Sequence, residues 1–152
     1  MLIRDHLKKI RRIEQSRSKL VPLADYELWY FATMTAAVNA MNAALHAAGA
    51  TVAERCFAHN VPVYYRPGRR AGTFTPVVRP FGDIEHVDSP EVEALIPERL
   101  GPAALALRQI EALREQSVRG NLKPSRAIVA RIETAYRRCL AASDAVIGAD
   151  TP

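Results

Sequence analysis

The sequence predicts an all-α fold, a four-helix bundle with a long irregular or hairpin-like crossover between its second and third helices. Apolar residues recur at three- and four-residue steps in four segments, which is the period of a helix that buries one face. Residues 50–97 lack this period and are rich in proline and β-branched residues. A length of 152 residues fits a single domain, 1–152, with its own core.

Two helices are expected in the first third of the chain. The first spans residues 1–20 and carries one apolar stripe, formed by Ile3, Leu7, Ile10 and Ile13. The second spans 24–48; it starts at Asp25, a good N-cap, and ends before Gly49. Its second half is rich in alanine, which lets neighbouring helices approach closely, so we place this helix at the centre of the bundle with its aromatic residues Trp29, Tyr30 and Phe31 buried.

The crossover over 50–97 contains its own elements. Aromatic and β-branched residues at 61–65 and 74–81 flank a proline- and glycine-containing turn, which indicates a hairpin, although its prolines restrict it to edge strands or extended loop. A short helix is expected over 52–58, and Ser89-Pro90 is typical of the start of one helical turn. A loop of this length is either functional or packs across the helices.

The last two helices are expected over 102–119 and 125–147. The third begins with Pro102, which suits the first helical position, and stops at Gly120. The fourth ends at Gly148.

The positive charge of the chain is concentrated at its start. The net charge is +5; residues 1–19 hold seven basic and two acidic residues, and the other 133 residues sum to zero. Five basic side chains lie opposite the apolar stripe: Arg4, Lys8, Arg11, Arg12 and Lys19. They form either a surface that contacts phosphates or an ordinary solvated helix face. The pairs Asp5–Lys9 and Glu14–Arg17 favour the solvated face, since they neutralise charge within the helix.

A second basic group lies in the crossover beside Tyr64 and Tyr65. It comprises Arg66, Arg69, Arg70 and Arg79. Arginine interleaved with tyrosine suits single-stranded nucleic acid, which binds by stacking and charge. The alternative is that these arginines pair with the acidic stretch 83–98 that follows.

The densest group of acid and base side chains is Asp83, Glu85, His86 and Asp88. A histidine among carboxylates acts as a general base or binds a divalent cation, or else the group is an exposed polar loop. The C-x-x-H motif at Cys56 and His59, with His46 and His86 as completions, is too loosely spaced for a closed zinc site. No phosphate-binding loop or nucleophile motif occurs, and we expect no metal or other cofactor.

One polar line runs along the alanine-rich helix and consists of Thr35, Asn39, Asn42 and His46. It either lines a ligand cavity or consists of buried groups that bond to the crossover, because buried polar groups require partners. The second interpretation predicts that the crossover packs here.

Both ends of the chain resemble HEPN-type helical bundles. The run Ser16-Arg-Ser-Lys-Leu-Val-Pro-Leu-Ala-Asp-Tyr-Glu-Leu, followed by a helix of alanine, aromatics and asparagine, is similar to the first helical pair. The run 113–121 before Ser125, with Ala135-Tyr136 further on, is similar to the second. HEPN domains are often RNA-binding, and many are ribonucleases of toxin–antitoxin systems.

The chain departs from the nuclease motif of that family, which places a histidine about six positions after an arginine near the start of the last helix. Arg114 and Arg119 lie in that neighbourhood, but the histidines are all in the first 86 residues: His6, His46, His59 and His86. The resemblance therefore implies a HEPN-like scaffold without the nuclease site.

Together these observations favour a non-enzymatic binding or interaction module in the cytoplasm whose partner is nucleic acid or a cognate protein. We expect a homo-oligomer, with a dimer as its form, because the apolar face at 28–31 is wider than one bundle needs. The alternative is a hydrolase-type enzyme that uses Asp83, Glu85, His86 and Asp88, with assistance from a metal ion. No membrane contact is expected, because the weakly polar stretch 28–48 is interrupted by polar residues and is rich in alanine.

Overall fold

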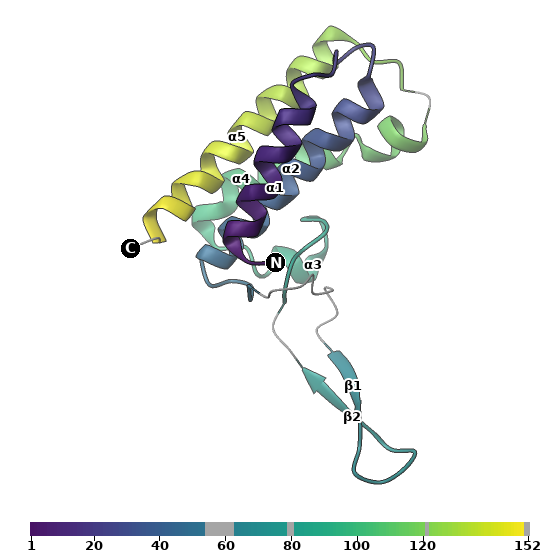
Figure 1. Ribbon diagram of the computed structural model, residues 1–152, viewed down its shortest axis with the longest axis vertical. Coiled ribbons are helices and arrows are strands. Elements are labelled where there is room, and N and C mark those ends of the chain that lie inside the picture. Colours follow the sequence, from purple (N-terminus) through teal and green to yellow (C-terminus); the bar gives the residue numbers. More distant parts are fainter. Residues whose placement is uncertain (54–62, 79–80, 121, 151–152) are drawn as a thin grey trace.

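The structure, a computed structural model, describes residues 1–53, 63–78, 81–120 and 122–150. It is mostly helical, which confirms the predicted class. The longest described helices lie side by side (Figure 1): α1 (Ile3–Arg17), α2 (Tyr26–Ala47), α4 (Gly101–Glu111) and α5 (Arg126–Asp150). α2 packs against α1, α4 and α5, and α4 packs along α5. The alanine-rich helix is therefore central, and Ala36, Ala37 and Ala44 are completely buried where its neighbours approach.

The first two helices differ from the prediction mainly at their ends. α1 stops at Arg17, and a turn over 18–25 leads into α2. Asp25 occupies the N-cap position but does not cap α2; its carboxylate instead accepts a hydrogen bond of 2.8 Å from the Val21 N–H. At the other end, Gly49 has φ 69°, a conformation that favours glycine and ends the helix.

The segment predicted as a single helix over 102–119 is divided in the structure. A 3₁₀ turn, η1 (Glu98–Leu100), precedes α4, and a π-helical turn, η2 (Glu115–Arg119), follows it. Ser117 in this turn is buried and lies 3.0 Å from the Tyr26 hydroxyl, which ties the turn to the start of α2. At Gly120 a Cβ atom would lie 2.9 Å from the Gln116 backbone, so the chain reverses where only glycine fits.

The crossover contains the hairpin that the sequence indicated. β1 (Val63–Pro67) and β2 (Phe74–Val78) are antiparallel, with Val63 opposite Val78, and they extend away from the helices (Figure 1). A helical turn, α3 (Pro90–Glu93), follows; the Ser89 hydroxyl caps it by accepting a bond from the Val92 N–H. The helix predicted over 52–58 falls largely outside the described residues.

The core lies around α2 and includes part of the crossover. Tyr30, Met41 and Leu45 of α2 are fully buried, as are Ile84 and Val87, so this part of the crossover contributes side chains to the core. The apolar residues at the start of α2 are buried on one side of the helix and exposed on the other. Trp29 is buried, but Leu28 and Phe31 are 61% and 53% exposed, so the prediction of a buried Phe31 is wrong. No described helix is long and apolar enough to cross a membrane.

Candidate functional site

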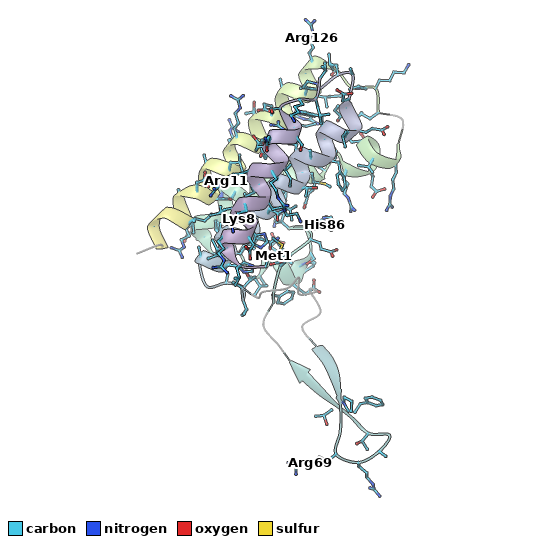
Figure 2. The ribbon with its side chains drawn as sticks, in the orientation of Figure 1. Met1, Lys8, Arg11, Arg69, His86 and Arg126 are labelled. Atoms are coloured by element: carbon cyan, nitrogen blue, oxygen red, sulfur yellow. The ribbon has the colours of Figure 1, made fainter. Side chains whose placement is uncertain are left out.

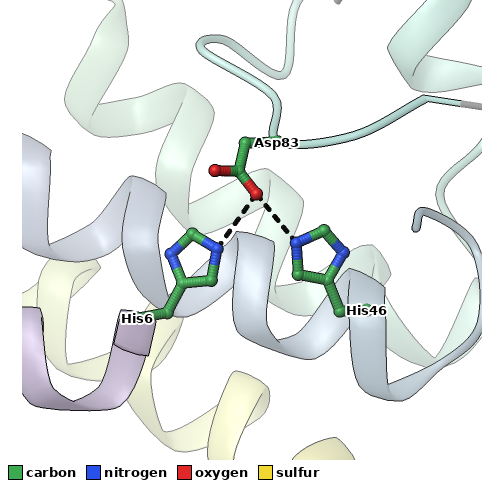
Figure 3. A group of neighbouring side chains, drawn as sticks. All are labelled: His6, His46 and Asp83. Atoms are coloured by element: carbon green, nitrogen blue, oxygen red, sulfur yellow. Dashed lines mark hydrogen bonds and ion pairs between the residues drawn. The ribbon is translucent and has the colours of Figure 1, made fainter. Parts of the chain in front are cut away.

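Three buried side chains from distant parts of the sequence converge at one end of α1 (Figure 3). His6 comes from α1, His46 from the end of α2 and Asp83 from the crossover. The Asp83 Oδ1 atom lies 3.1 Å from His6 Nε2 and 2.9 Å from His46 Nε2. Each side chain is at most 2% exposed. The sequence places a histidine at a core position of an amphipathic helix, and the fold supplies its partner 77 residues away.

The far nitrogen of each imidazole is also held. His6 Nδ1 lies 2.9 Å from Asn39 Oδ1, and His46 Nδ1 lies 2.7 Å from the Thr51 hydroxyl. Asn39 Nδ2 donates to the Thr35 carbonyl at 2.7 Å, which fixes Asn39 Oδ1 as an acceptor. His6 Nδ1 therefore carries the hydrogen in this bond.

This bond determines what His6 presents to Asp83. With its hydrogen on Nδ1, a neutral ring turns the Nε2 lone pair toward a carboxylate oxygen. Two acceptors 3.1 Å apart require positive charge between them, supplied either by a second proton on the ring or by a cation.

Asp83 is ionised although it is buried. Burial raises the pKa of its carboxyl, but the contacts with His46, His6 and the Met1 amino group outweigh burial and hold the pKa well below its usual range. The Met1 amino nitrogen lies 2.5 Å from Asp83 Oδ1. The second oxygen, Oδ2, is buried and has no hydrogen-bond partner among the described residues.

A pocket of about 250 Å³ lies beside this cluster. His6 and Asp83 form part of its wall, together with charged, polar and apolar side chains. The remaining lining residues are Met1, Lys9, Phe31, Met34, Thr35, Val38, Asn39, Asn42, Ile84, Glu85, His86 and Arg114. A larger hollow of about 650 Å³ lies elsewhere, between α4 and α5, and is lined mainly by small residues and by Arg131 and Arg138.

A second histidine in the pocket wall is oriented by a buried carboxylate. His86 Nδ1 lies 3.4 Å from Glu111 Oε1, and Arg114 Nη1 donates to His86 Nε2 at 3.1 Å. Because a guanidinium only donates, His86 Nε2 is the accepting nitrogen and Nδ1 carries the hydrogen. Burial raises the pKa of Glu111, and the bond from the Val87 N–H at 3.2 Å opposes that rise. The His86 side chain is 36% exposed, against 6% for Glu111.

The structure brings three of the four predicted acid and base residues to this pocket. Asp83, Glu85 and His86 line it, whereas Asp88 is exposed and is not among the lining residues. Two members of the polar line on α2, Asn42 and His46, bond to the crossover as the second interpretation predicted. Asn39 instead contacts His6 of α1, and Thr35, Asn39 and Asn42 line the pocket. Asn42 accepts from the Ile84 N–H at 2.7 Å and donates to the Ile84 carbonyl at 2.9 Å.

The two predicted basic groups lie apart (Figure 2). Arg4, Lys8, Arg11, Arg12 and Lys19 are exposed on or just after α1. Arg69 lies at the far end of the hairpin, distant from Lys8 and Arg11. Neither Arg69 nor Arg70 pairs with a carboxylate in the part of the chain that is described. The Arg66 side chain and Arg79, like Cys56 and His59, fall outside that part.

Sequence reasoning missed three residues of this site. His6 was visible as a histidine among the isoleucines and leucines of an amphipathic helix, which is an unusual core residue. Glu111 and Arg114 gave no local signal, because their partner His86 lies more than 20 residues earlier in the chain.

Comparisons of the chain with protein-family models, curated proteins and solved structures give no match.

Proposed function

We propose that this chain is a hydrolase-type enzyme that works in the pocket beside Asp83, with His86 as its general base. The observation that carries the proposal is the orientation of His86 by Glu111. A buried carboxylate that accepts the Nδ1 hydrogen turns the Nε2 lone pair toward Arg114 in the pocket wall. When the guanidinium turns to bind an anionic substrate, this lone pair is released to take a proton from water.

Both basic and acidic side chains line the pocket, and the basic ones suit a small anionic ester as substrate. Lys9 and Arg114 line the pocket and supply positive charge, while Phe31, Met34 and Val38 supply an apolar wall. Arg114 contacts His86 Nε2, so an anion bound by the guanidinium would lie beside the base. A volume of about 250 Å³ admits only a small group.

The test is hydrolysis of p-nitrophenyl phosphate and bis(p-nitrophenyl) phosphate by the purified chain. His86→Gln is expected to lower kcat/KM by about 100-fold or more, because it removes the base. Glu111→Gln is expected to lower it less, since the base remains but loses its orienting carboxylate. Asp88→Asn is the control, because Asp88 lies outside the pocket. Equal activity of wild type and His86→Gln would contradict the proposal.

A binding role is the second candidate, and the exposed basic face of α1 favours it. Arg4, Lys8 and Arg11 are open to solvent and are available to contact phosphates of a nucleic acid. A gel-shift titration of a short fluorescent RNA at two salt concentrations tests this role, with Lys8→Glu/Arg11→Glu and Arg69→Glu/Arg70→Glu as the two variants. Lys123→Glu/Arg126→Glu, at exposed positions outside both basic groups, is the matched charge change. Absence of binding at low salt rejects this candidate.

We further propose that the scaffold is a HEPN-like four-helix bundle that lacks the nuclease site and acts in the cytoplasm. The pairing of α1 with α2 and of α4 with α5 supports the bundle. Arg114, which the resemblance brings near the nuclease position, is bonded to His86 of the crossover, whereas the family pairs its arginine with a histidine of the last helix. Distances measured between spin labels placed on α1, α2, α4 and α5 test the scaffold.

We also propose that the chain forms a homodimer. The exposed apolar residues at the start of α2 form its interface. Leu28 and Phe31 are 61% and 53% exposed, and Val21 nearby is 60% exposed. Phe31→Lys is expected to convert the dimer to a monomer in light scattering, and Leu105→Lys on α4, an equally exposed position, is the control. A wild-type monomer rejects the dimer.

A further inference from the structure

We infer that His6, His46 and Asp83 form a binding site for one divalent transition-metal ion. Two imidazole nitrogens and one carboxylate are a donor set that zinc and other first-row divalent metals prefer. The three donor atoms lie within 4.8 Å of one another and are buried. Metal binding does not depend on the hydrolytic activity proposed above.

The spacing of the donor atoms suits a shared ion. Ligands about 2.1 Å from a metal and at tetrahedral or octahedral angles are roughly 3.0–3.4 Å apart. The two His Nε2 atoms lie 3.1 Å and 2.9 Å from Asp83 Oδ1, and all three donor atoms lie within 4.8 Å of one another, so binding an ion requires only an adjustment of the imidazole positions.

The groups behind the histidines orient them as metal ligands. A ligating histidine normally uses its other nitrogen to bond an oxygen, which fixes the ring and turns the lone pair toward the metal. Asn39 Oδ1 does this for His6 at 2.9 Å, and the Thr51 hydroxyl lies 2.7 Å from His46 Nδ1. The Nε2 atoms of both rings face Asp83 as a result.

The second carboxylate oxygen of Asp83 is an independent indication that a cation binds here. Its Oδ2 is buried without a described hydrogen-bond partner, although an unpaired buried oxygen is costly. A cation shared by both oxygens satisfies Oδ2. The Met1 amino group contacts Oδ1 at 2.5 Å, and the metal ion would replace that contact.

The position of the cluster indicates an open coordination site. His6 and Asp83 are part of the pocket wall, whereas His46 is not among the residues that line the pocket. An ion with three protein ligands on one side leaves a coordination position toward the pocket, which is the arrangement of a metal site that binds water or an exogenous ligand.

The experiment is a titration of the full, chelator-treated chain with Zn²⁺ and with Co²⁺, followed by calorimetry and visible absorption. We expect one ion per chain, a cobalt spectrum typical of nitrogen and oxygen ligands, and a raised Tm. Asp83→Asn and His46→Gln are expected to weaken binding at least 100-fold, and Thr51→Val, behind His46, by about 10- to 100-fold. Circular dichroism establishes that each variant retains its helices.

Two control variants separate this site from other residues and from the proposed activity. His86→Gln lies in the same pocket and is expected to bind metal as wild type does, even if hydrolysis is lost. Cys56→Ser/His59→Gln is also expected to bind normally. Undetectable binding by wild type at 100-fold excess of Zn²⁺ overturns the inference and assigns the cluster as an ion pair of imidazolium and carboxylate. Unchanged binding by Asp83→Asn and His46→Gln, or a cobalt–thiolate band lost in Cys56→Ser/His59→Gln, overturns it too.

Discussion

The two ends of α1 each bury charged side chains against α2, but they do so in different ways. At the C-terminal end, Arg17 is 10% exposed and each of its three guanidinium nitrogens has a partner. Its Nε donates to the Thr33 hydroxyl at 2.7 Å, and its terminal nitrogens contact Glu14 and Glu133. Its cationic carbon also lies 4.6 Å from the Tyr136 ring centre and 5.1 Å from that of Trp29.

The N-terminal end is not saturated in this way. Asp83 gathers its described contacts on one oxygen and leaves the other without a partner, and a pocket adjoins it. The Arg17 cluster fixes the positions of α1, α2 and α5, whereas the His6 cluster retains unused bonding capacity beside a cavity. Both ends bury charged groups. The His6 end differs because one of its buried oxygen atoms has no described partner and lies beside a pocket, and this difference distinguishes a candidate site from a structural ion pair.

The largest expected effect on stability comes from removing Arg17 at the C-terminal end of α1. Arg17→Met is expected to lower the free energy of unfolding by about 3 kcal/mol, because Glu14 loses its cation, Glu133 keeps only the exposed Arg137, and the Thr33 hydroxyl loses its charged donor. Urea denaturation followed by circular dichroism measures the change. Arg137→Met removes an exposed cation from the same Glu133 and is expected to cost less than about 0.5 kcal/mol. Equal costs would show that the Arg17 cluster is not a structural anchor.

A smaller effect is expected where the crossover is bound to α2. Asn42→Ala is expected to cost about 2 kcal/mol, because the N–H and carbonyl of Ile84 both lose their partner in a buried environment. Hydrogen exchange at residues 83–87 should accelerate in this variant while exchange in α5 remains slow. Exchange that is unchanged at 83–87 would mean that Asn42 does not hold the crossover in place.

The hydrogen bond between the uncharged side chains of Ser117 and Tyr26 is expected to contribute less to the free energy of unfolding than the Arg17 or the His6 cluster. Ser117→Ala is expected to cost about 1 kcal/mol, since the Tyr26 hydroxyl loses a buried partner 3.0 Å away. Tyr26→Phe removes the same bond from the other side. The double variant should therefore cost less than the sum of the two single changes, and strict additivity of the unfolding free energies would contradict the bond.

The smallest expected effect is on the chemical reactivity of Cys139, with no change in the stability of the protein. Burial raises the pKa of the Cys139 thiol to about 12, and its Sγ lies 3.8 Å from the Ala37 carbonyl. Since the thiolate is the reactive form, iodoacetamide at pH 8 should label this residue in Cys56→Ser protein only when the chain unfolds. Arg17→Met should speed this labelling. Rapid labelling of the folded protein would contradict the packing of α5 on α2.

Local pattern and long-range contact account for what the sequence could and could not predict. The three- and four-residue period revealed the helices, and the polar line at Asn42 and His46 predicted where the crossover packs, because a buried amide must find a partner. The site itself depends on pairs such as His6 with Asp83, which only the packing of α1 against the crossover brings together. Phe31 was predicted buried from its apolar neighbours, but no described element covers that face of α2.

The most direct test of the contrast between the two ends is the Tm of three proteins, wild type, Arg17→Met and Asp83→Asn, each with and without Zn²⁺. An ion that binds only the folded chain adds about 2.7 kcal/mol at 100 times its Kd. Zn²⁺ is predicted to raise the Tm of wild type and of Arg17→Met by a similar amount and to leave Asp83→Asn unchanged. A Tm that rises equally in all three proteins, or in none, would contradict the assignment of the His6 end as the functional one.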